Sequence, residues 1–187
     1  MGFFTASLAI LRFRSTLMQS RTLASVLVAT FAFITTYAIA SDDRNLETGL
    51  VAALSLKKGT TERIGDSGKA IQAYIRAGLI NKEPNQRADY TDYYLLKKPA
   101  SFMEHELVVI EEEYMARYVG CCVSPGAGVS VKLTGGAKNL EDFAQLNKCT
   151  LNKDVNLQKE LRDVSIKATL RPGSYANLSC RERDADR

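Results

Sequence analysis

The distribution of apolar residues along the middle of the chain predicts a β-sheet. Leu107–Ile110 is a continuous apolar run, which is typical of a buried strand, whereas Val129–Leu133 alternates between apolar and polar positions. We predict strands over Tyr90–Leu96, Leu107–Glu113, Ala116–Val123, Val129–Leu133 and Val164–Leu170, with a short further candidate over Tyr175–Cys180.

Three other segments repeat their apolar residues at helical spacing. Leu46, Leu50 and Leu54 follow each other every four residues, and Asp66 and Asn139 are residue types that cap helix N-termini. We predict helices over Asn45–Leu56, Ser67–Ile80 and Leu140–Lys148. The expected fold class is therefore α+β, an antiparallel sheet with about three helices packed on one face. We expect one globular domain over residues 41–180 and a charged, disordered tail over residues 181–187.

The first 40 residues have the pattern of an export signal. They contain no Asp or Glu. An uncharged run of 18 residues, from Leu23 to Ala40, follows Arg21 and ends in Ala38-Ile39-Ala40. A basic segment, an apolar run and a small-x-small cleavage site are typical of a secretory signal peptide. We expect cleavage after Ala40 and a periplasmic or secreted mature protein. An uncleaved run would be a membrane anchor near the lower length limit of about 20 apolar residues, and Met18 is an alternative start of translation.

Removal of this leader changes the charge balance. The chain has 25 basic and 21 acidic residues, and three of the basic ones, Arg12, Arg14 and Arg21, lie in the leader. The remaining net charge is about +1, because 22 basic residues then face 21 acidic ones. A nucleic-acid-binding domain carries a clustered excess of Lys and Arg. We therefore expect no nucleic-acid partner.

All four cysteines, Cys121, Cys122, Cys149 and Cys180, lie after the leader. An even number in an exported chain predicts structural disulfides, and four cysteines allow three pairings. Neighbouring side chains of a strand point to opposite faces, so we favour bonds from Cys121 and Cys122 to Cys149 and Cys180, one each. A disulfide between Cys121 and Cys122, or a soft-metal site made by their thiolates, remains an alternative. No CxxC spacing supports a metal, and we predict none.

The only histidine, His105, lies between Glu104 and Glu106. No second histidine, GxSxG or HExxH sequence accompanies it, so we interpret it as a surface histidine. The triplet 111–113 continues a predicted strand, which places Glu111 and Glu113 on one face. We interpret these carboxylates as a solvated face or as a charged strand edge that resists sheet-to-sheet pairing.

A turn-forming sequence offers a candidate interaction loop. Proline fixes φ and glycine permits positive φ, so Ser124, Pro125, Gly126 and Gly128 predict an exposed loop. Lys97–Met103 is a second candidate segment. A loop that does not bury itself is what an inhibitor- or immunity-type protein would present to its target.

Three functional hypotheses follow. The favoured one is an exported, non-enzymatic protein that binds another protein or a cell-envelope component, because no catalytic, phosphate-binding or cofactor motif occurs in the sequence. The second is a thiol-based metal-handling or redox protein that uses Cys121 and Cys122. The third is a small hydrolase-type enzyme that uses His105 with Glu111 and Glu113. We expect no cofactor, and a membrane association only if the leader is retained.

Overall fold

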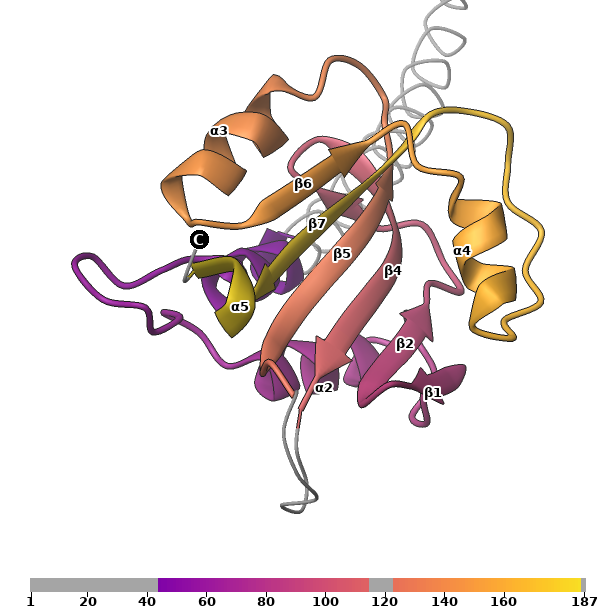
Figure 1. Cartoon of the computed structure of the whole chain (residues 1–187). Coiled ribbons are helices and arrows are strands. Elements are labelled where there is room, and N and C mark those ends of the chain that lie inside the picture. Colours follow the sequence, from indigo (N-terminus) through magenta and orange to yellow (C-terminus); the bar gives the residue numbers. More distant parts are fainter. Residues whose placement is uncertain (1–43, 115–122, 186–187) are drawn as a thin grey trace, which may run out of the picture. The chain divides into compact units, whose positions relative to one another are not determined.

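An antiparallel sheet of seven strands forms the centre of the computed structural model, which describes residues 44–114 and 123–185 (Figure 1). The strand order is β1-β2-β4-β5-β7-β6, and β3 pairs with the beginning of β4. The strands are β1 (Gln86–Ala88), β2 (Thr91–Leu95), β3 (Ser101–Phe102), β4 (His105–Glu113), β5 (Gly126–Lys132), β6 (Thr150–Lys153) and β7 (Tyr175–Arg181).

Five helices accompany the sheet in the described part of the chain, more than the three predicted. The first spans residues 44–54, and the others are α2 (Ser67–Arg76), α3 (Lys138–Leu146), α4 (Leu157–Asp163) and α5 (Glu182–Ala185). Asp66 caps α2 as predicted, because its carboxylate accepts a hydrogen bond of 2.7 Å from the Lys69 amide. None of these helices is both long and apolar enough to cross a bilayer.

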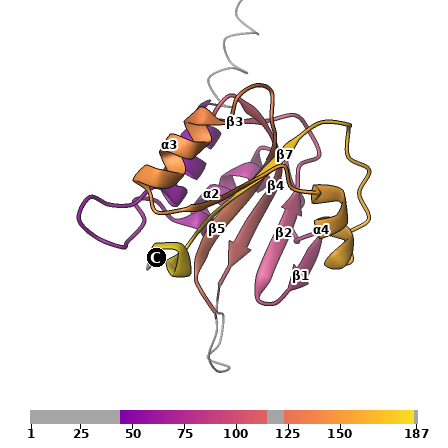
Figure 2. The same cartoon turned by 45° about the horizontal axis from the view of Figure 1, so that its top comes forward.

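The larger core lies between one face of the sheet and the first three helices (Figure 2). Leu50 and Leu54 of the first helix, Ile71 of α2 and Leu140 of α3 are buried there in one cluster with Val129 of β5. Apolar residues at helical spacing therefore meet alternate residues of the strands, which is the packing that the α+β prediction requires.

A smaller core on the other face belongs to α4. Leu157 and Leu161 of this helix pack with Val109 and Tyr175, and Ile166 completes the cluster. Val109 and Ile110 serve different cores because successive residues of a strand point to opposite faces.

The predicted strand over Val164–Leu170 is wrong. This segment makes no ladder with any described strand, and follows α4 as irregular chain. Its alternation has another cause, since Val164, Ile166, Ala168 and Leu170 all face the small core of α4 while the residues between them face solvent. The predicted strand Ala116–Val123 lies outside the described residues, apart from Val123.

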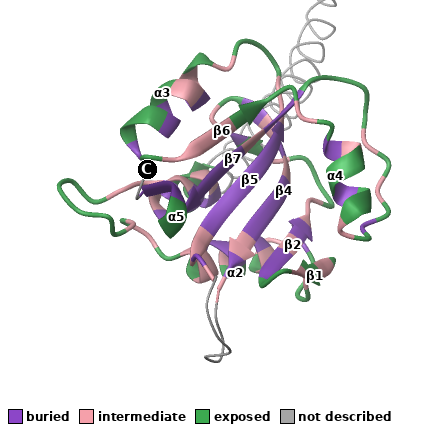
Figure 3. Ribbon diagram, in the orientation of Figure 1, coloured by how far each residue is buried: buried purple, intermediate pink, exposed green. Residues whose placement is uncertain are grey.

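The prediction of a disordered tail is wrong for residues 181–185. Arg181 is the last residue of β7, which lies between β5 and the edge strand β6, and α5 follows it. Asp184 and Ala185 of α5 are buried. Figure 3 shows β7 as one of the most buried elements of the sheet, so the C-terminal residues belong to the fold.

Candidate functional site

His105 is buried, not at the surface as the sequence suggested. Its Nε2 atom lies 3.0 Å from Asn139 Oδ1, and its Nδ1 atom accepts a hydrogen bond of 3.3 Å from the Thr134 amide. Asn139 in turn donates to the Met103 carbonyl oxygen. The imidazole thus connects the start of β4 to the loop before α3, through Thr134, and to the first turn of α3, through Asn139, so both of its nitrogens have structural contacts.

Glu111 and Glu113 share a face as predicted, but that face is not solvated. Both side chains are buried, and Arg181 of β7 lies between them. Arg181 Nη2 donates to Glu111 Oε2 at 2.9 Å. Arg181 Nε lies 3.0 Å from Glu113 Oε2, although its N–H is not directed well enough to form a hydrogen bond. β4 is an interior strand of the sheet, so these carboxylates do not protect an edge.

The remaining contacts of this cluster come from distant segments. The Ser124 amide and Arg183 both donate to Glu113, at 2.9 and 3.0 Å. Asn177 donates to Glu111 at 2.9 Å. Buried charges need such partners, because an unpaired ion in a protein interior is strongly unfavourable. The contacts of Arg181, Arg183 and Asn177 hold β7 and α5 against β4, and the Ser124 contact holds the start of β5 there.

The histidine and the glutamates are not brought together. His105 is at one end of β4 and Glu111 is six positions further on, and a strand rises about 3.3 Å per residue, which separates them by roughly 20 Å. The geometry therefore offers no common site for the hydrolase-type chemistry that the sequence left as an alternative.

The first predicted interaction loop is also not exposed. Gly126 and Gly128 are part of β5, and Ser124 and Gly128 are buried. Gly126 has φ of +138° and its α-carbon lies so close to β7 that an added Cβ would stand 2.8 Å from the Arg181 Cα atom. Glycine is needed here for close packing of two strands, which the sequence pattern does not distinguish from a turn.

The second predicted segment is exposed at residues 97–99 and at Ser101 but not at Phe102. Residues 97–99 are exposed beside a hollow of about 230 Å³, whereas Phe102 is completely buried in the larger core. The Phe102 ring packs edge-on against the ring of Phe143 in α3, with ring centroids 6.4 Å apart.

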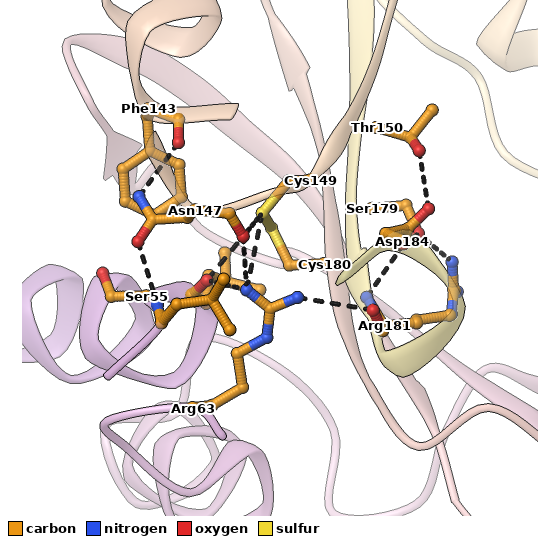
Figure 4. The surroundings of a disulfide bond; sticks show 12 residues. Ser55, Arg63, Phe143, Asn147, Cys149, Thr150, Ser179, Cys180, Arg181 and Asp184 are labelled. Carbon is orange, nitrogen blue, oxygen red and sulfur yellow. Dashed lines mark hydrogen bonds between the residues drawn. A yellow bond between two sulfur atoms is a disulfide. The ribbon is translucent and has the colours of Figure 1, made fainter. Parts of the chain in front are cut away.

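Cys149 and Cys180 form a disulfide, which differs from the pairing we favoured (Figure 4). They lie at the adjoining ends of β6 and β7, where the register of the two antiparallel strands places them opposite one another. Cys121 and Cys122 lie outside the described residues. Of the three complete pairings, only the one that joins Cys121 to Cys122 contains the observed bond.

Arg63 gathers several chain segments around this disulfide (Figure 4). Its Nη1 atom donates at 2.8 Å to the carbonyl oxygens of Leu54, at the end of the first helix, and of Asn147, just after α3. Its Nη2 atom donates to the Arg181 carbonyl at 3.3 Å. Burial lowers the pKa of Arg63, and the charge of Asp184 partly offsets this effect. The guanidinium stays charged, because the pKa of arginine lies far above neutral pH.

Asn147 makes the second link between these segments. Its Oδ1 atom accepts a hydrogen bond of 2.9 Å from the Leu56 amide, and its Nδ2 atom donates to the Phe143 carbonyl at 2.9 Å. Together with the bridge between Leu56 and Arg63, these contacts fix the base of the loop over residues 55–64 against the C-terminal end of α3. In Figures 1 and 2 this loop extends beyond the sheet beside α3.

A groove of about 750 Å³ lies between the loop and α3. We call it the loop–α3 groove, and its surface is mostly apolar. Ile64 and Leu146 line it with exposed fractions of 64% and 79%, and the buried Phe143 also lines it. The only other large hydrophobic residue exposed in the described part of the chain is Tyr90, at 44%, in the turn between β1 and β2.

The same groove has a positive rim. Lys57, Lys58 and Lys148 line it, and no Asp or Glu is among the described residues that do. Lys57 Nζ lies 3.8 Å from Glu62 Oε2 in an ion pair whose two side chains are both exposed to solvent. Sequence reasoning missed this site, because its two walls are far apart in the chain; Leu56 and Asn147, which join them, are separated by 91 positions.

Comparison with known proteins gives no assignment. No family model matches the chain, and neither a curated relative nor a solved structure matches it significantly.

Proposed function

We propose that the mature chain is an exported, non-enzymatic binding protein whose loop–α3 groove receives a segment of a partner protein. The observation that carries this proposal is the groove itself. It contains two of the three exposed large hydrophobic side chains of the described residues, and they come from different elements. Exposed apolar surface gathered in one hollow is characteristic of interaction sites, whereas scattered single residues are not.

The walls of the groove are held in position before any partner arrives. Arg63, Asn147 and the Cys149–Cys180 disulfide connect the loop, α3 and β7. Binding to a rigid surface costs less conformational entropy than binding to a loop that must first become ordered. This supports a binding role over a purely structural one, because folding alone gives no reason to fix Ile64 and Leu146 in solvent.

Export supports the same class of function. The leader pattern, the cysteines after it and the disulfide fit an oxidising compartment outside the cytoplasm. A partner would then be another exported protein or a protein of the cell envelope.

Site-specific photo-crosslinking in the source organism tests this proposal. A benzophenone amino acid replaces Leu146 in the groove, and the same amino acid replaces Tyr90 as the matched exposed control. We expect one discrete adduct from position 146 that disappears when Ile64→Asp is added, and no such adduct from position 90. The captured protein is then identified by mass and its binding repeated with purified components. An absent adduct at position 146, or one that Ile64→Asp leaves intact, contradicts the proposal.

A thiol-based redox role is the second candidate, because the Cys149–Cys180 bond removes the partners that we had expected for Cys121 and Cys122. Two neighbouring cysteines then have only each other within the chain, as a reducible pair. Alkylation of the natively exported protein, before and after mild reduction, tests this role. Thiols at both positions that appear only after mild reduction support it, and stable bonds to other proteins contradict it.

A further inference from the structure

We infer that the segment bound by the loop–α3 groove is an acidic, amphipathic helix, whose apolar side chains pack between Ile64 and Leu146 and whose carboxylates pair with the three lysines of the rim. This inference rests on the proposed function and specifies the chemistry of the partner.

The positive charge of the groove is local. The chain after the leader has a net charge of only about +1, because 22 basic residues face 21 acidic ones. Lys57, Lys58 and Lys148 nevertheless border one hollow without a lining carboxylate. The Lys148 ammonium donates to the Ala185 carbonyl oxygen at 3.2 Å and keeps two further N–H donors for a partner. The nearby Glu62 pairs with Lys57 at 3.8 Å, but the pair is solvent-exposed and so contributes little stability. A carboxylate of a partner can therefore replace Glu62 at small cost.

The apolar part of the groove has the size of a short helical contact. The exposed Ile64 of the loop and Leu146 of α3 line it, together with the buried Phe143 and the half-buried Leu56. A volume of about 750 Å³ accommodates a few large side chains, and not a folded domain. A helix that presents apolar residues at positions i, i+3 or i+4, and i+7 delivers such a set into one groove.

The lining also argues against nucleic acid. Proteins that bind single strands combine positive charge with aromatic rings on which bases stack. The only aromatic ring of the lining belongs to Phe143, which is 8% exposed and already contacts Phe102 edge-on. An anionic lipid surface shares the lysine-and-apolar chemistry and is treated as an outcome of the test.

A charge series of model peptides tests the inference with the full exported protein. Three helical peptides of equal length carry leucine at i, i+3, i+4 and i+7, and Glu, Gln or Lys at the remaining positions. Vesicles of phosphatidylglycerol are the fourth probe. Binding is followed at low salt by amide chemical shifts of the protein, which also locate the site.

We expect the Glu peptide to bind most tightly and the Lys peptide most weakly. The Glu peptide should bind about tenfold more tightly than the Gln peptide, because it can form three exposed ion pairs. Shifts should cluster at residues 55–64 and 143–148. The triple variant Lys57→Glu, Lys58→Glu, Lys148→Glu should reverse the order, and Leu146→Asp should abolish binding. Tyr90→Asp, which removes an exposed apolar side chain elsewhere, should change nothing.

Each contrary result has a separate meaning. Equal binding of the Glu and Lys peptides, no binding of the Glu peptide, or shifts outside the two segments overturns the acidic partner. Vesicle binding without peptide binding overturns it in favour of a lipid surface. A groove-dependent adduct in the crosslinking experiment, together with failure of the Glu peptide, leaves the proposed function standing and refutes only this inference.

Discussion

At the scale of single residues, Arg181 supplies the positive charge that the buried carboxylates of Glu111 and Glu113 require. It reaches Glu111 and Glu113 on β4 from β7, with β5 between them, and its side chain is only 7% exposed. Ion pairs that are removed from water contribute little net stability when intact, but the loss of one partner leaves a buried charge. Arg183 contacts the same Glu113 from a side chain that is 46% exposed.

These two arginines give a matched pair of variants. Arg181→Ala leaves Glu111 without its ion pair and Glu113 with only the half-exposed Arg183, and it should lower the free energy of unfolding by about 3–5 kcal/mol. Arg183→Ala breaks an ion pair with a solvent-exposed arginine and should lower it by about 1 kcal/mol or less. Urea denaturation at pH 7 measures both values. Equal effects of the two substitutions would show that the burial of Arg181 adds nothing to the cost of losing its ion pairs.

Asp184 makes the stability of the C-terminal segment dependent on pH. Burial raises the pKa of Asp184, but hydrogen bonds from Thr150, Ser179 and the Arg181 amide outweigh burial and hold the pKa below its ordinary value. A carboxylate with a lowered pKa in the folded state stabilises the protein above its unfolded-state pKa, about 4. That contribution is lost as the pH falls below about 4, through the folded-state pKa.

The variant Asp184→Asn isolates this effect. It should be less stable than the parent chain at pH 7, since an amide nitrogen replaces one of the two accepting oxygens. The difference in free energy of unfolding should shrink as the pH falls below about 4, because the parent carboxyl then becomes protonated. Denaturant unfolding between pH 7 and pH 3 measures this difference. A difference in stability that grows toward acid pH would contradict the lowered pKa of Asp184.

The sequence predicts part of this chemistry and misses the rest for a clear reason. Strand alternation alone places Glu111 and Glu113 on one face. Their burial depends on Arg181, which is 70 positions away from Glu111 and lies in a segment that looks like a charged tail. From the sequence alone, a charged residue that is buried beside a distant partner looks the same as one that is exposed to solvent. The two can be distinguished only when the pairing of the strands is known.

At the scale of elements, periodicity predicts best where it reflects burial against a regular partner. The three predicted helices match residues 44–54, α2 and α3, and the strands predicted at Tyr90–Leu96 and Leu107–Glu113 match β2 and β4. At Val164–Leu170 the same alternation arises in irregular chain that covers the small core. α4 and β6 are missed because they are short and bury few apolar residues.

The disulfide should stabilise the elements that it joins. Cys149 and Cys180 are 31 positions apart, and closing a loop of that length contributes about 3–4 kcal/mol through the unfolded state. The double variant Cys149→Ala, Cys180→Ala should lose roughly this free energy of unfolding in urea. Peptide mapping of the parent should give a Cys149–Cys180 linked fragment, and a fragment linking Cys121 or Cys122 to either residue would contradict the fold at this point.

Arg63 should hold the loop over residues 55–64 more than it holds the whole fold. Arg63→Met keeps the apolar stem but removes the donors to Leu54 and Asn147. Hydrogen exchange at the Leu56 and Ile64 amides should become about tenfold faster or more, while amides of β5 keep their protection. Uniformly faster exchange over the entire sheet would show that Arg63 supports global stability and does not specifically organise the groove.

At the scale of the whole molecule, composition and patterning are sufficient for the fold class but not for the binding surface. Antiparallel strands and apolar helix faces come from local sequence, whereas the loop–α3 groove needs two distant segments to meet. Ile64 and Leu146 are unremarkable in sequence, and only their shared exposure in one hollow distinguishes them. The lysines around them become a charge pattern only after folding.

The most direct test of the account compares Leu146→Asp with Tyr90→Asp in two measurements, affinity for the captured partner and free energy of unfolding. Leu146 is 79% exposed, so its replacement should change stability by no more than about 0.5 kcal/mol. We predict that Leu146→Asp weakens partner binding more than tenfold at unchanged stability, and that Tyr90→Asp alters neither. Full affinity of the Leu146→Asp protein for its partner would contradict the central claim that the groove is the binding site.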